Sequence, residues 1–418
     1  MSRFGSGLEA LAKGAMISPF TRARRLLEDV PAGHAKPIEL TIGDPRETPP
    51  DFVPAMMAEA AASVASYPKI RGSDELKASI AAWIGRRYGL AGVVDPVREI
   101  LPCNGSREGL FFATIPAVGR KSFKGKPAML IVNPFYQAYL GAALATECEP
   151  VMLNATAATG HLPDLDALAR EPDLLARTAA LFICSPANPQ GAVATRAYIL
   201  KALELARAHD FLLFFDECYS EIYTLTPPIG ALEVAATTRE RFRNLVVFNS
   251  LSKRSNLPGL RSGFLAGDGD FLETLAEIRN MVAPQMPGPV QHASAAVWAD
   301  DAHVVRIREA YRAKFDICDR VLGNRFGYRR PEGGFFLWLD VGDGEEAARR
   351  LWRDAGVRVL PGGYLSAGEG AANPGGRYIR VALVDELETV GEALGRLSDV
   401  LGDGNLRARG DSDGRVDR

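Results

Sequence analysis

The stretch Ser250-Leu-Ser-Lys253-Arg-Ser-Asn-Leu-Pro-Gly-Leu-Arg261-Ser-Gly263 places a lysine shortly after an apolar run. That run, residues 244–249, reads Asn-Leu-Val-Val-Phe-Asn and predicts a buried strand. A lysine beyond the end of a buried strand loses part of its hydration, which lowers the pKa of its ammonium group. Because the neutral amine is a nucleophile toward aldehydes, Lys253 is the first candidate catalytic residue.

Two more apolar runs end in polar groups. Residues 211–215 lead directly into Asp216, with Tyr219 close behind, and residues 180–184 lead into a turn of prolines and glycine that holds Asn188. In an open sheet of parallel strands, the ligand site lies beyond the carboxyl ends of the strands. The pattern therefore predicts a doubly wound α/β domain in which Asn188, Asp216 and Lys253 meet at one edge of the sheet.

These groups match what pyridoxal phosphate requires from a protein. Lys253 supplies an amine for the aldehyde of the cofactor. Asp216 would keep the ring nitrogen protonated through a charge-assisted hydrogen bond, which makes the ring a better electron sink. Tyr219 and Asn188 would donate hydrogen bonds to the ring oxygen and stabilise its anion.

The phosphate of such a cofactor needs its own binding loop. Residues 102–112 contain a turn that opens a helix, where free backbone N–H groups and the helix dipole favour an anion. The predicted phosphate contacts are Gly105, Ser106, Arg107, Ser250 and Arg261. Tyr136, which follows the strand-like residues 128–132, would stack on the ring as a flat face.

From about residue 38 to about residue 383 the chain resembles the fold-type I, class I and II aminotransferases. The likeness rests on residues 250–263, on Asn133-Pro-Phe-Tyr-Gln-Ala-Tyr139, on Asp216-Glu-Cys-Tyr219 and on Val359-Leu-Pro-Gly-Gly-Tyr364. Within the family these motifs most resemble the succinyldiaminopimelate aminotransferases of lysine synthesis. One departure is Gln190, where the family commonly has threonine.

The resemblance implies further roles for matching positions. Lys253 would be the Schiff-base lysine and proton shuttle, with Asp216 and Tyr219 as its catalytic partners. Arg380 would clamp the substrate α-carboxylate, with Gly43 and Asn188 as further substrate contacts. Tyr67 would reach the phosphate of a neighbouring subunit, which implies a homodimer with shared active sites.

The implied reaction is a ping-pong amino transfer between glutamate and 2-oxoglutarate on one side and the pair N-succinyl-2-amino-6-oxopimelate and N-succinyl-diaminopimelate on the other. The distal groups of the succinylated substrate need cations, and Arg22, Lys69 and Arg71 are the candidates. A broader aspartate, alanine or aromatic aminotransferase, or one for acetylated substrates, is the alternative.

Length and periodicity predict more than one domain. A chain of 418 residues is too long for one ordinary core. The resemblance implies a large, mostly parallel seven-stranded sheet domain over residues 49–298 and a smaller α+β domain over residues 299–401. Residues 1–48 would pack on the small domain, and residues 402–418, which are polar and rich in glycine, predict a flexible tail.

Composition argues against several other classes of protein. Lys and Arg total 49 against 51 for Asp and Glu, and the formal charge of −2 gives no electrostatic footprint for nucleic acid. No apolar run approaches the roughly 18 residues of a membrane helix, and the N-terminus lacks a signal-peptide layout. The five cysteines and five histidines show no metal-binding spacing. We expect a cytoplasmic enzyme with small-molecule partners and no metal.

A rival interpretation lies in Ser250-Leu-Ser-Lys253, which is also the Ser-x-x-Lys motif of penicillin-binding serine hydrolases. The partner motifs Ser-Asp-Asn and Lys-Thr-Gly do not occur in the chain, and here the motif follows a strand instead of opening a helix. Each candidate residue alone also has an ordinary structural explanation, and only their joint pattern favours a cofactor site.

Overall fold

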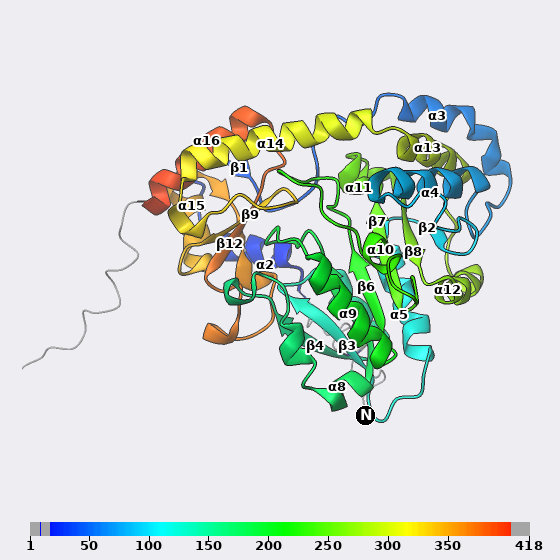
Figure 1. The fold of residues 1–418 in the computed structure, drawn as a ribbon. Coiled ribbons are helices and arrows are strands. Elements are labelled where there is room, and N and C mark those ends of the chain that lie inside the picture. The colour runs from blue at the N-terminus through cyan, green and yellow to red at the C-terminus, as the bar shows by residue number, and fades with distance from the viewer. Residues whose placement is uncertain (1–8, 10–16, 403–418) are drawn as a thin grey trace, which may run out of the picture.

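A computed structural model describes residue 9 and residues 17–402, and its centre is a seven-stranded sheet (Figure 1). The strand order is β2-β8-β7-β6-β5-β3-β4. All neighbouring pairs from β7 to β4 are parallel, and β8 runs antiparallel to β7 and to β2. The strands are β2 (Ile100–Cys103), β3 (Ala128–Asn133), β4 (Glu149–Asn154), β5 (Thr178–Cys184), β6 (Leu212–Asp216), β7 (Leu245–Ser250) and β8 (Gly263–Gly267). The predicted fold class is confirmed.

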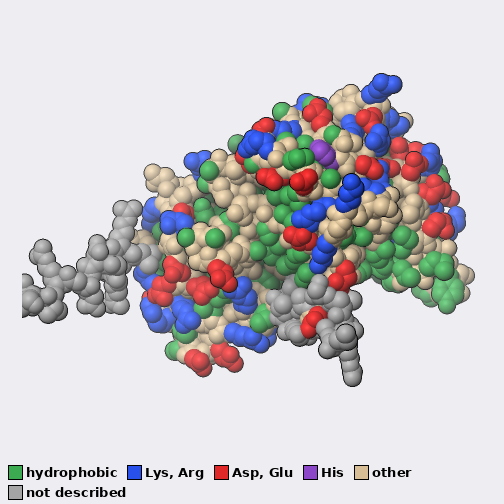
Figure 2. Space-filling view, turned by 90° about the horizontal axis from the view of Figure 1, so that it is seen from below, with side chains coloured by type: hydrophobic (Ala, Val, Ile, Leu, Met, Phe, Trp, Pro, Cys, Tyr) green, Lys and Arg blue, Asp and Glu red, His purple; other side chains and the backbone are tan. Residues whose placement is uncertain are grey.

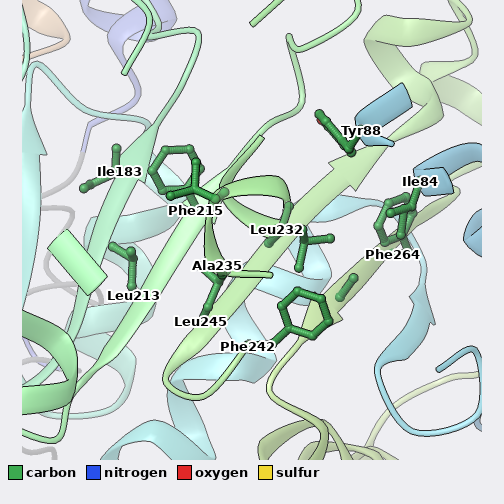
Figure 3. Close-up of a cluster of buried hydrophobic side chains, with 14 of the residues drawn as sticks. Ile84, Tyr88, Ile183, Leu213, Phe215, Leu232, Ala235, Phe242, Leu245 and Phe264 are labelled. Atoms are coloured by element: carbon green, nitrogen blue, oxygen red, sulfur yellow. The ribbon is translucent and has the colours of Figure 1, made fainter. Parts of the chain in front are cut away.

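Alternate residues of the central strands feed two separate cores. In β6, Leu213 and Phe215 belong to the core on one face, whereas Leu212 and Phe214 belong to the core on the other. Figure 3 shows Leu213 and Phe215 packed with Leu245 and with residues of covering helices. Continuous apolar runs are what a strand covered on both faces requires, which explains the composition of these strands.

Helices cover both faces of this sheet. Buried residues of α5, α6 and α12 pack in one core, and those of α4, α9, α10 and α13 pack in the other. Local caps fix several helix starts, as at α9, where the Thr195 side chain accepts from the backbone N–H of Tyr198. The helices up to α13 are α2 (Pro19–Leu26), α3 (Val53–Glu59), α4 (Asp74–Tyr88), α5 (Ser106–Gly119), α6 (Gln137–Ala145), α7 (Leu165–Leu168), α8 (Pro172–Ala176), α9 (Arg196–Ala208), α10 (Ala231–Ala235), α11 (Leu251–Arg254), α12 (Gly269–Val282) and α13 (Gly288–Ala299).

A second, smaller unit follows in the chain. Its antiparallel sheet has the order β11-β12-β9, formed by β9 (Phe336–Asp340), β11 (Leu360–Pro361) and β12 (Tyr378–Ala382). Its helices are α14 (Ala302–Leu322), α15 (Gly344–Ala355) and α16 (Leu387–Gly402). Figure 1 shows α14 running from the side of α16 toward α13, so one long helix connects the two units.

The N-terminal part of the chain joins this smaller unit. Strand β1 (Ile38–Glu39) pairs in parallel with β10 (Val357–Arg358), and Ile38 lies in the core of the smaller unit. The domain boundaries at residues 48, 298 and 401 stay predictions. Apart from residue 402, the predicted tail lies outside the described residues, as does most of residues 1–16.

Three observations bear on the predictions from composition. No helix in the part of the chain that the structure describes is both long and apolar enough to span a bilayer. Figure 2 shows acidic and basic side chains intermixed on the described part of one face. All five cysteines are buried and free of disulfides.

Candidate active site

The carboxyl ends of β5, β6 and β7 deliver the predicted residues into one cavity of about 440 Å³. The strands are neighbours in the sheet, so the segments that follow them lie side by side. The smaller unit supplies Phe336 and Arg380 to the same cavity. Of the predicted site residues, those that line it are Gly43, Ser106, Arg107, Tyr136, Asn188, Asp216, Tyr219, Ser250, Lys253, Arg261 and Arg380.

Lys253 lies on the single-turn helix α11, directly after β7. Its Nζ donates to the backbone carbonyl of Gly43 at 2.6 Å and lies 5.4 Å from the ring centre of Phe335. Burial lowers the pKa of Lys253 to about 8, against a smaller opposing effect of Asp44. A substantial fraction of this amine is therefore neutral near physiological pH, as a nucleophile or a proton acceptor requires.

One argument against the Ser-x-x-Lys interpretation was wrong in detail. The motif does open a helix, because Ser250 caps α11 by accepting from the backbone N–H of Ser252. The Ser250 hydroxyl lies 2.9 Å from the Ser252 hydroxyl and donates to the carbonyl of Ser262 at 3.0 Å. No bond from Lys253 to the Ser250 hydroxyl is present among the described residues, and Lys253 instead donates to Gly43.

The depressed pKa of Lys253 predicts a pH dependence. The ammonium form predominates below about pH 8 and cannot attack an aldehyde, so the rate at which the apoprotein captures pyridoxal phosphate should rise about tenfold per pH unit up to about pH 8 and then level off. Stopped-flow absorbance measures this rate. A rate that is flat from about pH 6.5 to about pH 9 would contradict the assignment.

Asp216, the last residue of β6, is a buried carboxylate, 6% exposed. Its Oδ2 accepts from the Tyr139 hydroxyl at 2.7 Å, and its Oδ1 accepts from the backbone N–H of Cys218 at 3.1 Å. Burial raises the pKa of Asp216, and the hydrogen bonds from Cys218 and Tyr139 lower it in part. It has no salt bridge to a basic side chain among the described residues, so a cationic or N–H partner in the cavity would be stabilising.

Tyr139 is a site residue to which the sequence analysis gave no role. It lies on α6 one turn beyond Tyr136, and its ring stacks on Phe182 at 4.7 Å with an interplanar angle of 17°. The sequence shows Tyr139 only as a second tyrosine three residues after Tyr136, and this spacing does not indicate its contact with Asp216. The Tyr139 hydroxyl bonds to Asp216, whereas the Tyr136 hydroxyl accepts from Arg107.

The Tyr139→Phe variant should test this contact. It removes a hydrogen bond to a charged group, worth about 1.5–3 kcal/mol, which should lower turnover by about 10- to 100-fold. Since the bond favours the ionised carboxylate, its loss should raise the pKa of Asp216 and move the acid limb of the pH–rate profile to higher pH. Tyr198→Phe, which loses a partly buried hydroxyl bonded to the carbonyl of Pro163 outside the cavity, is the control. An unchanged acid limb in Tyr139→Phe would contradict the role.

Asn188, Tyr219 and Arg380 form a connected group. The Asn188 amide nitrogen donates to the Tyr219 hydroxyl at 3.5 Å, and its oxygen accepts from Arg380 Nη1 at 3.2 Å. Arg380 is 4% exposed, and its Nη2 donates to the carbonyl of Thr41 at 2.7 Å. Burial lowers the pKa of Arg380 to about 10, and its buried Nε has no hydrogen-bond partner within the described part of the chain. A substrate carboxylate would satisfy that group.

The predicted phosphate loop is built around a close approach to Arg261. Gly105 has φ +84°, a backbone conformation that favours glycine, and a Cβ there would lie 2.5 Å from Arg261 Nη2. Gly105 precedes the first helical residue, Ser106, whose backbone N–H is one of the free donors at the start of α5. Arg107 Nε donates to the Tyr136 hydroxyl at 2.6 Å, which fixes that ring in the cavity wall.

Other predicted residues lie away from this cavity. Tyr67 is 98% exposed and does not line it. Lys69 pairs with Asp74 at 3.4 Å, and Arg71 donates to the carbonyl of Val97. Arg22 lines a second, adjoining cavity, where its guanidinium lies 3.9 Å from the ring centre of Tyr364.

Comparison with known proteins decides the family. Residues 35–397 match the family described as aminotransferase class I and II. The chain belongs to this aminotransferase family. The predicted membership of the class I and II aminotransferase family is therefore confirmed.

Several relatives of this aminotransferase have more specific names. It is 31% identical to an LL-diaminopimelate aminotransferase of Syntrophobacter fumaroxidans over 90% of this chain and 95% of the relative. A crystal structure of an aminotransferase from Neisseria meningitidis matches with a TM-score of 0.88 at 36% identity, covering 94% of this chain and 100% of the other. A probable N-succinyldiaminopimelate aminotransferase from Thermus thermophilus matches with a TM-score of 0.76 at 25% identity, covering 94% and 100%.

Aminotransferases of this family depend on pyridoxal phosphate, and the cavity fits that cofactor. It holds an amine of lowered pKa, a buried carboxylate without a cationic partner among the described residues and an arginine beside a glycine loop at a helix start. Lys253 would hold the aldehyde, Asp216 the ring nitrogen, and Ser106, Ser250 and Arg261 the phosphate. These individual roles stay predictions.

Proposed function

We propose that this aminotransferase acts in diaminopimelate synthesis, transferring an amino group between glutamate and the keto form of N-succinyl-diaminopimelate. The names of two relatives support the diaminopimelate skeleton. The choice of an N-acylated substrate rests on the adjoining cavity of about 990 Å³, which borders the first cavity and is lined in part by Arg22. This cavity has room for a long substrate side chain with a distal carboxylate, and the guanidinium of Arg22 would bind that carboxylate.

The chain's own residues account for the chemistry. Arg380 binds the α-carboxylate of the amino donor through its guanidinium fork. The neutral amine of Lys253 takes the Cα proton, and Asn188 and Tyr219 keep the guanidinium of Arg380 oriented. Pyridoxal phosphate, when bound, supplies the aldehyde that carries the amino group and the ring that withdraws electrons from Cα. Donor and acceptor use the same site in turn, which gives ping-pong kinetics.

A second candidate is amino transfer to and from diaminopimelate without an acyl group. The name of the Syntrophobacter relative favours it. The two candidates differ at the distal nitrogen of the substrate, which is an amide in one case and an ammonium group in the other. A broader specificity for aspartate, alanine or aromatic amino acids is the third outcome.

One donor screen separates these candidates. With 2-oxoglutarate as acceptor, kcat/KM is measured for N-succinyl-LL-diaminopimelate, N-acetyl-LL-diaminopimelate, LL-diaminopimelate, aspartate, alanine and phenylalanine. We expect the succinylated donor to exceed the others by about 10- to 100-fold, the range that pocket contacts supply. Preference for LL-diaminopimelate would favour the second candidate instead.

We also propose that the enzyme is a homodimer in the cytoplasm. Tyr67 and Met281 are 98% and 82% exposed, so both side chains are available for contact with a partner subunit. The unpaired cysteines suit a reducing compartment. Light scattering should give about twice the mass of the chain, and mixing Tyr67→Phe with Lys253→Ala protomers tests whether active sites are shared.

A further inference from the structure

Gln137 occupies a fixed position at the edge of the active-site cavity. It is the first residue of α6, between Tyr136 and Tyr139. The Tyr136 hydroxyl accepts from Arg107, and the Tyr139 hydroxyl donates to Asp216 at 2.7 Å. These two contacts anchor the start of the helix, so the backbone of Gln137 is positioned relative to the reacting groups.

The side-chain nitrogen of Gln137 is a buried donor without a partner. Its Nε2 makes no hydrogen bond with any described residue. Buried donors in native proteins are nearly always satisfied, by protein, by water or by a ligand. Since Gln137 lines the cavity, a ligand in that cavity is the natural acceptor.

Gln137 also lies at the boundary between the two cavities. Six residues line both the cavity of about 440 Å³ and the adjoining one of about 990 Å³, namely Phe20, Arg107, Phe135, Tyr136, Gln137 and Arg261. Phe20 and Phe135 are apolar, Tyr136 already accepts from Arg107, and Arg261 is assigned to the cofactor phosphate. The Nε2 of Gln137 is thus a polar group at this boundary that is bonded to no described side chain and is assigned to no part of the cofactor.

We propose that Gln137 is a specificity-determining residue that donates a hydrogen bond to an acceptor in the substrate side chain, the amide carbonyl of an N-acyl group. A substrate held by Arg380 and Lys253 must pass this boundary if its side chain enters the second cavity. A carbonyl oxygen there satisfies Nε2, whereas a free ammonium group offers only further donors. The inference rests on the proposed function and deepens it.

The test compares Gln137→Leu with wild-type holoenzyme. With N-succinyl-LL-diaminopimelate as donor, we expect kcat/KM to fall by about 10- to 100-fold, chiefly through KM, and with LL-diaminopimelate by less than about threefold. Gln190→Leu is the matched control, since Nε2 of Gln190 is also buried without a hydrogen-bond partner in the described part of the chain but the residue lines neither cavity. Its ratio of the two kcat/KM values should stay within about twofold of wild type.

The inference is overturned if the ratio of kcat/KM for the succinylated donor to kcat/KM for LL-diaminopimelate is the same in Gln137→Leu as in wild type. If wild type turns over neither compound, the proposed substrate is wrong, and the inference is decided by inhibition constants of the same two compounds against glutamate turnover. A weaker inhibition by the succinylated compound alone, after Gln137→Leu, supports the role. Unchanged constants for both compounds overturn it.

Discussion

Replacing Lys253 by alanine is expected to lower turnover by about 10⁴-fold or more, because one side chain serves as nucleophile and as proton carrier. Burial lowers the pKa of its amine to about 8, and the residue lines the cavity. The measurements are kcat with glutamate and mass spectrometry after borohydride treatment. Borohydride should fix a pyridoxyl group on the peptide that contains Lys253 in the wild type and on no peptide in the variant.

Lys121→Ala is the control for this variant. Burial also lowers the pKa of Lys121, but its Nζ donates to the carbonyl of His209 and the residue does not line the cavity. We expect near-wild-type turnover and unchanged labelling of Lys253. A Lys253→Ala enzyme that keeps its activity would remove the basis of the proposed mechanism.

The second large effect is expected for Arg380→Leu. Loss of a buried, hydrogen-bonded charge opposite the substrate carboxylate should lower kcat/KM for amino-acid donors by about 10²- to 10³-fold. Arg380→Lys keeps the charge but loses the fork, so it should recover only part of this loss. Steady-state kinetics with glutamate measure both effects.

Two controls test whether the loss of kcat/KM in Arg380→Leu depends on the substrate carboxylate. Arg377→Leu, which removes a mostly exposed arginine paired with Asp340, should leave kcat/KM within about twofold of wild type. An amine without a carboxylate should react slowly and equally with wild type and Arg380→Leu. If kcat/KM fell by the same factor for donors with and without a carboxylate, Arg380 would have a structural role and another residue would bind the α-carboxylate.

The sequence determined the strands and the residues at their ends. The apolar runs before Asn188, Asp216 and Lys253 are continuous because each strand is covered on both faces, and such runs can be recognised without coordinates. The polar residue that follows each run lies at the carboxyl edge of a parallel sheet by topology alone. Therefore β5, β6 and β7 and the groups beyond them could be predicted together.

Tertiary structure alone decided which groups meet across the chain. Tyr139 and Asp216 are far apart in sequence, as are Lys253 and Gly43, and no periodic pattern in the sequence predicts either contact. The lowered pKa of Lys253 depends on burial, which is a property of packing and not of local sequence. The same is true of the buried Nε2 of Gln137, which has no hydrogen-bond partner among the described residues. Local patterns place a side chain on its own element, whereas the free energy of burying it depends on what the rest of the chain packs against it.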